Sequence, residues 1–237
     1  MNPTAPEAGA IDRAPQVQRM FDQLAPTYDK ANRILSLGLD QRWRRKAIEK
    51  LGIQGKGRVL DLCAGTLDLS QQLLIAGADS VIAVDFSAEM LAAGRIKMRE
   101  DAPIEIVQAD ARQLPIPDAS VDAIICGFGL RNVPEVHRAI GECARVMRPG
   151  AILVVLDFFQ PQGFVSRVLQ STYNRFIMPT IGGWITGYGT AYRYLADSID
   201  SFQTRQSFEA LLEEHGLKSS GIDMFPPVAA MVWGVRE

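Results

Sequence analysis

Short apolar runs bounded by acidic residues or glycines recur through the middle of the chain. Five of them predict strands, at 58–63, 81–84, 104–107, 121–126 and 151–156. Segments with helical periodicity separate these strands, at about 68–76, 87–93 and 134–147. Apolar strands that alternate with helices are typical of a parallel sheet buried on both faces. The pattern therefore predicts an α/β fold.

The two ends of the chain extend this pattern. Residues 1–14, rich in Pro, Ala and Gly, predict a mobile tail, and residues 15–237 a single domain. Helical spacing predicts helices at 16–24 and 40–51, the second with Asp40 as its N-cap, and another at 204–215. A closing antiparallel hairpin at 217–224 and 228–235 would raise the sheet to seven strands. Residues 158–194, rich in aromatic and aliphatic side chains, predict an apolar insertion over the carboxyl edge of the sheet.

Composition narrows the functional classes. Hydrophobic residues make up 47% of the 237 residues and the formal net charge is −2, which favours a globular core and argues against a broad nucleic-acid surface. The three cysteines form no CxxC pair and there are only two histidines, so neither a disulfide framework nor a metal site is expected. No apolar run approaches the roughly 18 residues of a spanning helix, and we expect a cytoplasmic protein.

Candidate ligand residues follow three of the predicted strands. After the first, Gly65 lets the backbone pass close to a ligand. Asp85 ends the second strand, where an acid can accept hydrogen bonds from both ribose hydroxyls. Phe86 can flank an adenine ring whose amino group Asp110 can read. Carboxyl ends of parallel strands share one edge of a sheet, where ligands bind. The predicted cofactor residues at this edge are Asp61, Gly65, Thr66, Asp85, Phe86, Asp110 and Ala111.

The first of these turns distinguishes between two nucleotide cofactors. A dinucleotide needs a glycine-rich turn and a helix N-terminus for its pyrophosphate. This turn has a single glycine, and Asp68 stands where the phosphate would lie and would repel it. An acid there tolerates a ligand with an ammonium and a sulfonium. The sequence therefore favours S-adenosylmethionine over NAD.

Four segments make the chain resemble the UbiE/MenG/COQ5 family of quinone C-methyltransferases. MFDQLAPTYDKANRILSLGLDQRWRR at 20–45 is similar to the family's N-terminal signature, and VLDLCAGTLDL at 59–69 to its cofactor loop. GFGLRNV at 127–133 is the most specific segment, and AYRYLADSIDSF at 191–202 resembles the tyrosine-rich segment. The resemblance implies a Rossmann-like class I methyltransferase that transfers a methyl group from S-adenosylmethionine to a ring carbon of a prenylated quinol.

The resemblance also implies roles for single residues. The matched cofactor positions are Thr66, Asp85, Asp110, Ala111 and Gly127, the last where relatives often carry serine. Tyr28, Arg131 and Asn132 match positions that face substrate or cofactor. We expect Arg131 to stabilise charge that moves from phenolate to ring, and Asn132 and Tyr28 to orient the ring oxygens or a water that removes the ring proton.

Departures from the family pattern leave alternatives open. Leu67 replaces a common glycine in the cofactor loop, and 225–234 lacks the Gly-Gly and histidine often found there. Demethylmenaquinol is favoured as acceptor over the benzoquinol precursor of ubiquinone. The alternatives are oxygen or nitrogen methylation of another small molecule, a non-catalytic cofactor-binding scaffold, and a nucleotide-dependent oxidoreductase. A homodimer and peripheral membrane contact also stay open. The basic cluster proposed for that contact is Arg42, Arg44, Arg45 and Lys46.

Overall fold

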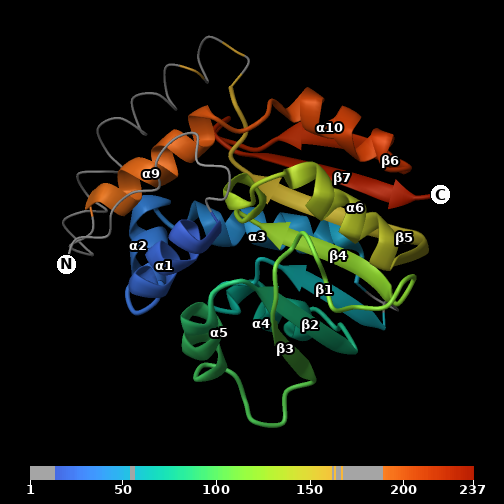
Figure 1. Cartoon of the computed structure of the whole chain (residues 1–237), viewed down its shortest axis with the longest axis horizontal. Helices are drawn as coiled ribbons and strands as arrows, with labels where there is room; N and C mark the ends of the chain where they lie inside the picture. Colours follow the sequence, from blue (N-terminus) through green and yellow to red (C-terminus); the bar gives the residue numbers. More distant parts are fainter. Residues whose placement is uncertain (1–13, 54–56, 162, 164–166, 168–188) are drawn as a thin grey trace.

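A seven-stranded sheet forms the centre of the computed structural model, which describes residues 14–53, 57–161, 163, 167 and 189–237. The strand order is β3-β2-β1-β4-β5-β7-β6 (Figure 1). β1 to β5 pair in parallel, and β7 runs antiparallel to both β5 and β6. This confirms the predicted mostly parallel sheet of seven strands.

The strands follow the apolar runs of the sequence. Their bounds are β1 Arg58–Leu62, β2 Ser80–Asp85, β3 Ile104–Gln108, β4 Val121–Gly127, β5 Met147–Asp157, β6 Leu217–Asp223 and β7 Ala230–Arg236. β5 begins earlier than predicted, because the pairing with β4 shifts register and jumps from Val121↔Met147 to Ala123↔Ile152. Gly150, at φ +79°, lies in the residues between these two pairs. The Pro149-Gly150 turn therefore belongs to the strand, and the preceding helix ends at Val146.

Helices cover both faces of the sheet. Their bounds are α1 Ala14–Leu24, α2 Tyr28–Leu35, α3 Leu39–Leu51, α4 Asp68–Ile75, α5 Ala88–Arg95, η1 Leu130–Asn132, α6 Val136–Val146, α9 Gly189–Asp200 and α10 Arg205–Glu214. α3 and α4 bury apolar side chains with Val59, Val81 and Ile125 on one face. α6 and α10 bury apolar side chains against the other face. That face is formed by Leu60 and by the strand residues that alternate with the first set. The sheet is thus buried on both sides, as its apolar strands require.

A separate cluster lies beyond one end of the sheet. α1, α2 and α9 gather there in Figure 1, and their side chains pack with Met90 of α5. α2 is absent from the sequence prediction. The predicted N-cap at Asp40 is wrong, because Gly38 occupies that position and Asp40 lies in the first turn of α3. Asp40 is buried there and accepts a hydrogen bond from Ser36 Oγ at 2.7 Å.

Two predicted segments fall largely outside the described residues. Of the tail at 1–14, the structure describes only Ala14, which begins α1. Of the apolar insertion at 158–194, it describes 158–161, 163, 167 and the start of α9. Within the described part of the chain, no helix is long and apolar enough to cross a membrane.

Candidate functional site

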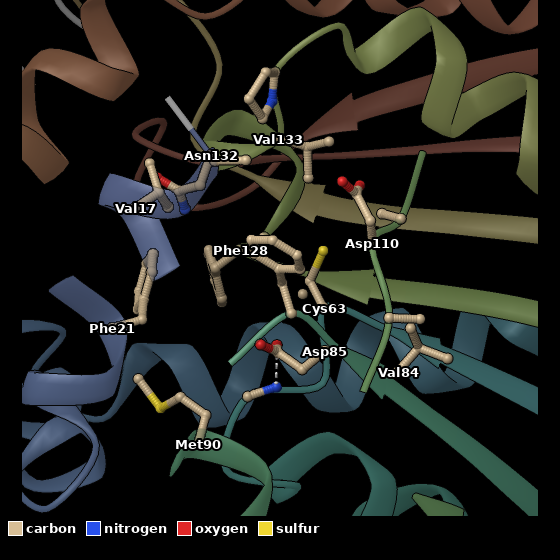
Figure 2. A pocket seen from close by; sticks show the side chains of 18 of the residues that line it. Val17, Phe21, Cys63, Val84, Asp85, Met90, Asp110, Phe128, Asn132 and Val133 are labelled. Atoms are coloured by element: carbon tan, nitrogen blue, oxygen red, sulfur yellow. Dashed lines mark hydrogen bonds between the residues drawn. The ribbon is translucent and has the colours of Figure 1, made fainter. Parts of the chain in front are cut away.

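A cavity of about 750 Å³, partly open to solvent, lies at the carboxyl edge of the sheet. The ends of β1, β2, β3 and β4 form its floor, and α1, α2 and α5 contribute to its walls. Figure 2 shows Asp85, Asp110, Cys63 and Phe128 around the same space, with Phe21 of α1 and Met90 of α5 across from them. The predicted site residues among its lining are Tyr28, Gly65, Asp85, Phe86, Asp110, Ala111, Gly127 and Asn132.

Asp85 is held by backbone donors on both carboxylate oxygens. Gly65 N–H donates to Oδ2 at 2.8 Å, the dashed line in Figure 2, and Ser87 N–H donates to Oδ1 at 2.9 Å. Ser87 also begins α5, because its Oγ accepts from Met90 N–H, as the sequence predicts. Burial raises the pKa of Asp85, while the backbone hydrogen bonds oppose this shift. Each oxygen can accept a further hydrogen bond, so the carboxylate suits a diol in the cavity.

The turn after β1 requires left-handed backbone at three alternate positions. Cys63, Gly65 and Leu67 have φ values of +56°, +53° and +61°. A Cβ on Gly65 would meet nothing within 4 Å, so its backbone is open to the cavity. The thiol of Cys63 also lines the cavity, and its hydrogen bond with Cys126, together with burial, raises its pKa. A neutral thiol is a poor nucleophile, so Cys63 serves as a wall of the cavity.

Asp110 and Ala111 form the opposite end of the floor. Arg112 donates to both oxygens of Asp110, with Nη2 at 2.7 Å from Oδ2. Burial alone would raise the pKa of Asp110, but the hydrogen bonds and charge of Arg112 outweigh it and lower the pKa. Asp110 therefore stays ionised and fixed in orientation beside the cavity.

Two of the predicted cofactor residues, Thr66 and Asp61, lie beneath the cavity lining and not in it. Thr66 is buried, and its Oγ1 donates to Asp29 Oδ1 of α2 at 2.5 Å. Asp61 is 1% exposed, accepts from Ser70 Oγ at 2.6 Å through Oδ2, and leaves Oδ1 without a partner. Burial raises the pKa of Asp61 to about 7. Neither is among the residues that line the cavity.

Asp68 has a different environment from the predicted one. It does not line the cavity, and its carboxylate pairs with Lys97 Nζ at 3.0 Å and Arg33 Nη2 at 3.9 Å. Lys97 also binds Asp29 at 2.6 Å, which ties α2 to the loop after β1. These cations partly compensate the charge of Asp68.

Aromatic and amide side chains form the wall above the floor. Tyr28 of α2 lines the cavity, and burial raises the pKa of its phenol. Asn132 of η1 also lines it, and its Oδ1 has no hydrogen-bond partner. Phe21 meets Tyr28 edge-on, with ring centroids 6.0 Å apart. This wall can contact a flat ring and offers an amide oxygen as acceptor.

Arg131 lies behind the same wall. Its Nη1 is 2.7 Å from Oδ1 of the fully buried Asp157 and 2.6 Å from the carbonyl oxygen of Phe128. Its guanidinium carbon lies 5.4 Å from the ring centre of Phe158. Arg131 is not among the cavity-lining residues, but its charge lowers the pKa of Tyr28 against the larger effect of burial.

The sequence analysis missed part of the lining. The missed residues are Ala14, Val17, Phe21, Cys63, Val84, Met90, Ala109, Phe128, Gly129, Val133 and Pro134. Val17 and Phe21 belong to the helical apolar pattern at 16–24, which predicts the helix without showing what its apolar side faces. Among the described residues, no group of His, Cys, Asp or Glu side chains could hold a metal ion.

The chain matches known proteins over most of its length. The ubiE/COQ5 methyltransferase family matches residues 10–236. The chain is 40% identical over 201 residues to a ubiquinone/menaquinone biosynthesis C-methyltransferase UbiE from Syntrophotalea carbinolica, covering 84% of each chain. It is 38% identical over 200 residues to a demethylmenaquinone methyltransferase from Thermus thermophilus, covering 83% of this chain and 90% of the other.

Solved structures of lower identity share the fold. An S-adenosylmethionine-dependent methyltransferase from Thermotoga maritima superposes with a TM-score of 0.67 at 14% identity, covering 93% of this chain and 100% of the other. One from Mesorhizobium loti superposes with a TM-score of 0.61 at 18% identity, covering 84% of this chain and 100% of the other. The family match and the curated relatives both cover most of the chain. The chain therefore belongs to the ubiE/COQ5 methyltransferase family.

Proposed function

We propose that the chain transfers a methyl group from S-adenosylmethionine to a ring carbon of a prenylated quinol in quinone biosynthesis. The main support for this proposal is that one cavity combines an acidic floor with an upper wall that contains a phenol and an amide. Asp85, Asp110 and Ala111 lie at its floor, and Tyr28 and Asn132 lie above them. The demethylated naphthoquinol that precedes menaquinone is the favoured acceptor, and the benzoquinol precursor of ubiquinone is the second.

The floor of the cavity fits a nucleoside. Asp85 presents a carboxylate fixed by two backbone donors, suited to a ribose diol. Phe86 and Ala111 line the neighbouring space, where an adenine ring can lie, and Asp110 stays ionised as an acceptor for its amino group. The open backbone at Gly65 leaves room for the rest of the cofactor, which would supply an electrophilic methyl group on a sulfonium when bound.

The upper wall fits an electron-rich ring. Its carbon has to lie in line with the methyl group, and holding two reactants in that geometry supplies much of the rate. Asn132 Oδ1 can accept a hydrogen bond from a ring hydroxyl, and the Tyr28 phenol can donate one to a ring oxygen. As the new carbon–carbon bond forms, the sulfonium–methyl bond would break and leave its electron pair on the sulfur of S-adenosylhomocysteine. The ring proton would then pass to a water, and we assign the orientation of this water to Tyr28 and Asn132.

Arg131 contributes charge from behind the wall. As negative charge moves from the phenolate into the ring, a fixed cation nearby stabilises the transition state. The ion pair with Asp157 fixes Arg131, and its bond to the Phe128 carbonyl holds the backbone between Gly127 and Asn132. Thr66 and Asp61 support the cofactor from the layer beneath the cavity.

The experiment is methyl transfer from labelled S-adenosylmethionine to each reduced prenylated acceptor in detergent. Methylated product from the naphthoquinol, the benzoquinol or both supports the function and ranks the acceptors. An enzyme that binds S-adenosylhomocysteine but methylates neither would refute the quinol assignment and leave another small-molecule acceptor.

A prenylated acceptor also suggests where the protein works, at the inner face of the cytoplasmic membrane. Arg42, Arg45 and Lys46 are exposed on α3, and no ion pair engages them among the described residues. Arg44, predicted as part of this basic cluster, is buried instead. Leu37, just before α3, is 87% exposed. Replacing the three exposed cations by glutamine should reduce sedimentation with anionic lipid vesicles, by about 1 kcal/mol per charge. Unchanged sedimentation would exclude this surface.

A further inference from the structure

Arg44 of α3 is a buried cation without a hydrogen bond. The residue is 9% exposed, and among the described residues none accepts a hydrogen bond from its guanidinium. The nearest acid is Asp40, with 3.8 Å between Arg44 Nε and Asp40 Oδ2. Asp40 already accepts hydrogen bonds from Ser36 at 2.7 Å and Gln41 at 2.9 Å. A buried guanidinium is normally hydrogen-bonded as well as ion-paired, so Arg44, which contacts the Asp40 carboxylate and the Phe128 ring, lacks a hydrogen-bond acceptor.

The guanidinium lies directly behind the cavity floor. A Cβ built on Gly127 would be 3.5 Å from Arg44 Nη1, and Gly127 lines the cavity at the end of β4. Arg44 also lies over the ring of Phe128, 5.5 Å from its centroid, and Phe128 faces the cavity in Figure 2. Because residue 127 has no side chain, the guanidinium of Arg44 faces the backbone of β4 at a position that lines the cavity.

A carboxylate oxygen without a hydrogen-bond donor accompanies this cation without a hydrogen-bond acceptor. Asp61 Oδ1 is buried without a donor, and the pairing of β1 with β4 places Asp61 beside Ile125, two residues before Gly127. The charge of Arg44 lowers the pKa of Asp61 against the larger effect of burial. One cation and one carboxylate oxygen, both lacking a hydrogen-bond partner, complement a ligand that carries both charges.

We propose that Arg44 binds the carboxylate of the α-amino-acid end of the cosubstrate, at the cavity floor beside Gly127. This rests on the proposed use of S-adenosylmethionine, whose nucleoside end the Asp85 and Asp110 side of the cavity would hold. A carboxylate matches the planar donors of a guanidinium and can accept two of them. It would supply the hydrogen-bond acceptor that Arg44 lacks, and the ammonium group beside it would lie toward Asp61.

The test compares two ligands that share the nucleoside. S-Adenosylhomocysteine carries the amino-acid end, whereas 5′-methylthioadenosine lacks it. Dissociation constants of both are measured by titration calorimetry on the full chain, for the native protein and for Arg44→Met. We expect Arg44→Met to weaken S-adenosylhomocysteine about 10- to 100-fold and 5′-methylthioadenosine less than about threefold. Arg44→Lys keeps the charge without the planar fork and should give an intermediate loss.

Arg45→Met is the matched control, because Arg45 is the exposed neighbour on the same helix. It should leave both dissociation constants unchanged. An equal loss for both ligands in the Arg44 variants would show a structural role and overturn the proposal, as would no loss for either. If the native protein bound neither ligand, the proposed function itself would fail, which distinguishes the two. Should Arg44→Met not fold, the ratio of the two constants in Arg44→Lys decides.

Discussion

Gly94 of α5 lies directly against Leu67 in the loop after β1. A Cβ at position 94 would be 2.5 Å from Leu67 Cγ and 2.7 Å from the carbonyl carbon of Thr66. Leu67 is 1% exposed and has φ +61°. It stands where the family commonly has glycine, so here a buried leucine fills the space that the glycine in the facing helix leaves open.

This contact predicts that Gly94→Ala destabilises the protein. The added methyl group must displace both the leucine and the loop backbone, and overpacking of this kind costs about 1–3 kcal/mol. Chemical denaturation measures the loss in the free energy of unfolding. Ala92→Ser, an enlargement at an exposed position of the same helix, should change stability by less than about 0.5 kcal/mol. Equal stabilities of Gly94→Ala and the native protein would show that α5 does not approach the loop so closely.

Asp85→Asn should weaken binding of S-adenosylhomocysteine about 10- to 100-fold, because a neutral amide replaces a charged acceptor at the ribose. The amide also presents an N–H group to one of the backbone donors that now hold the carboxylate. Titration calorimetry gives the constants. Asp68→Asn, which changes an acid outside the cavity lining, should have a small effect. A similar loss in both variants would mean that net charge, rather than the ribose contact, governs affinity.

Asp61 predicts a pH dependence of stability. Burial raises its pKa in the folded chain to about 7, above the value of 3.8 for a free side chain. The folded state then holds the proton more tightly than the unfolded state, so this group's contribution to stability is lost as pH rises from about 4 through 7. Asp61→Asn removes the titration. Relative to the native protein, the variant should gain thermal stability between pH 4 and pH 7, and the difference should level off above pH 7. A difference independent of pH over this range would contradict the raised pKa.

Substitutions of Arg131 and Asp157, which form an ion pair, distinguish an effect on catalysis from an effect on folding. Arg131→Lys keeps a charge but removes the guanidinium whose Nη1 donates to both Asp157 and the Phe128 carbonyl, and we expect kcat to fall about 10- to 100-fold. Binding of S-adenosylhomocysteine should stay within about threefold. Asp157→Asn leaves a buried guanidinium unpaired and should lower the free energy of unfolding by about 3–5 kcal/mol. An Arg131→Ala variant with unchanged turnover and intact cofactor binding would remove Arg131 from the mechanism.

The sheet could be predicted from the sequence because its parallel strands are continuous apolar runs. The glycine turn at Gly65 and the acid at Asp85 could also be placed, since both are tied to strand ends. α2 could not, because its sequence is mostly polar and it is held by contacts distant in sequence, such as Asp29 with Thr66 and Lys97.

Arg44 and Asp68 were misread for related reasons. Arg44 stands in a run of basic residues that suggests an exposed face, but it lies one helical turn from Asp40 and Ala47, which are buried. That spacing was the available signal. Asp68 lies 29 residues from the Lys97 that compensates it, and no local pattern shows such a pairing.

The most direct test of the account is the position of the transferred methyl group. The enzyme is incubated with S-adenosylmethionine labelled with ¹³C in its methyl group and the reduced prenylated demethylnaphthoquinol, and the product is analysed by NMR. The account predicts a label bonded to the open ring carbon, with loss of the ring proton. A label on oxygen or nitrogen, or an unlabelled quinol beside an enzyme that binds S-adenosylhomocysteine, would contradict it.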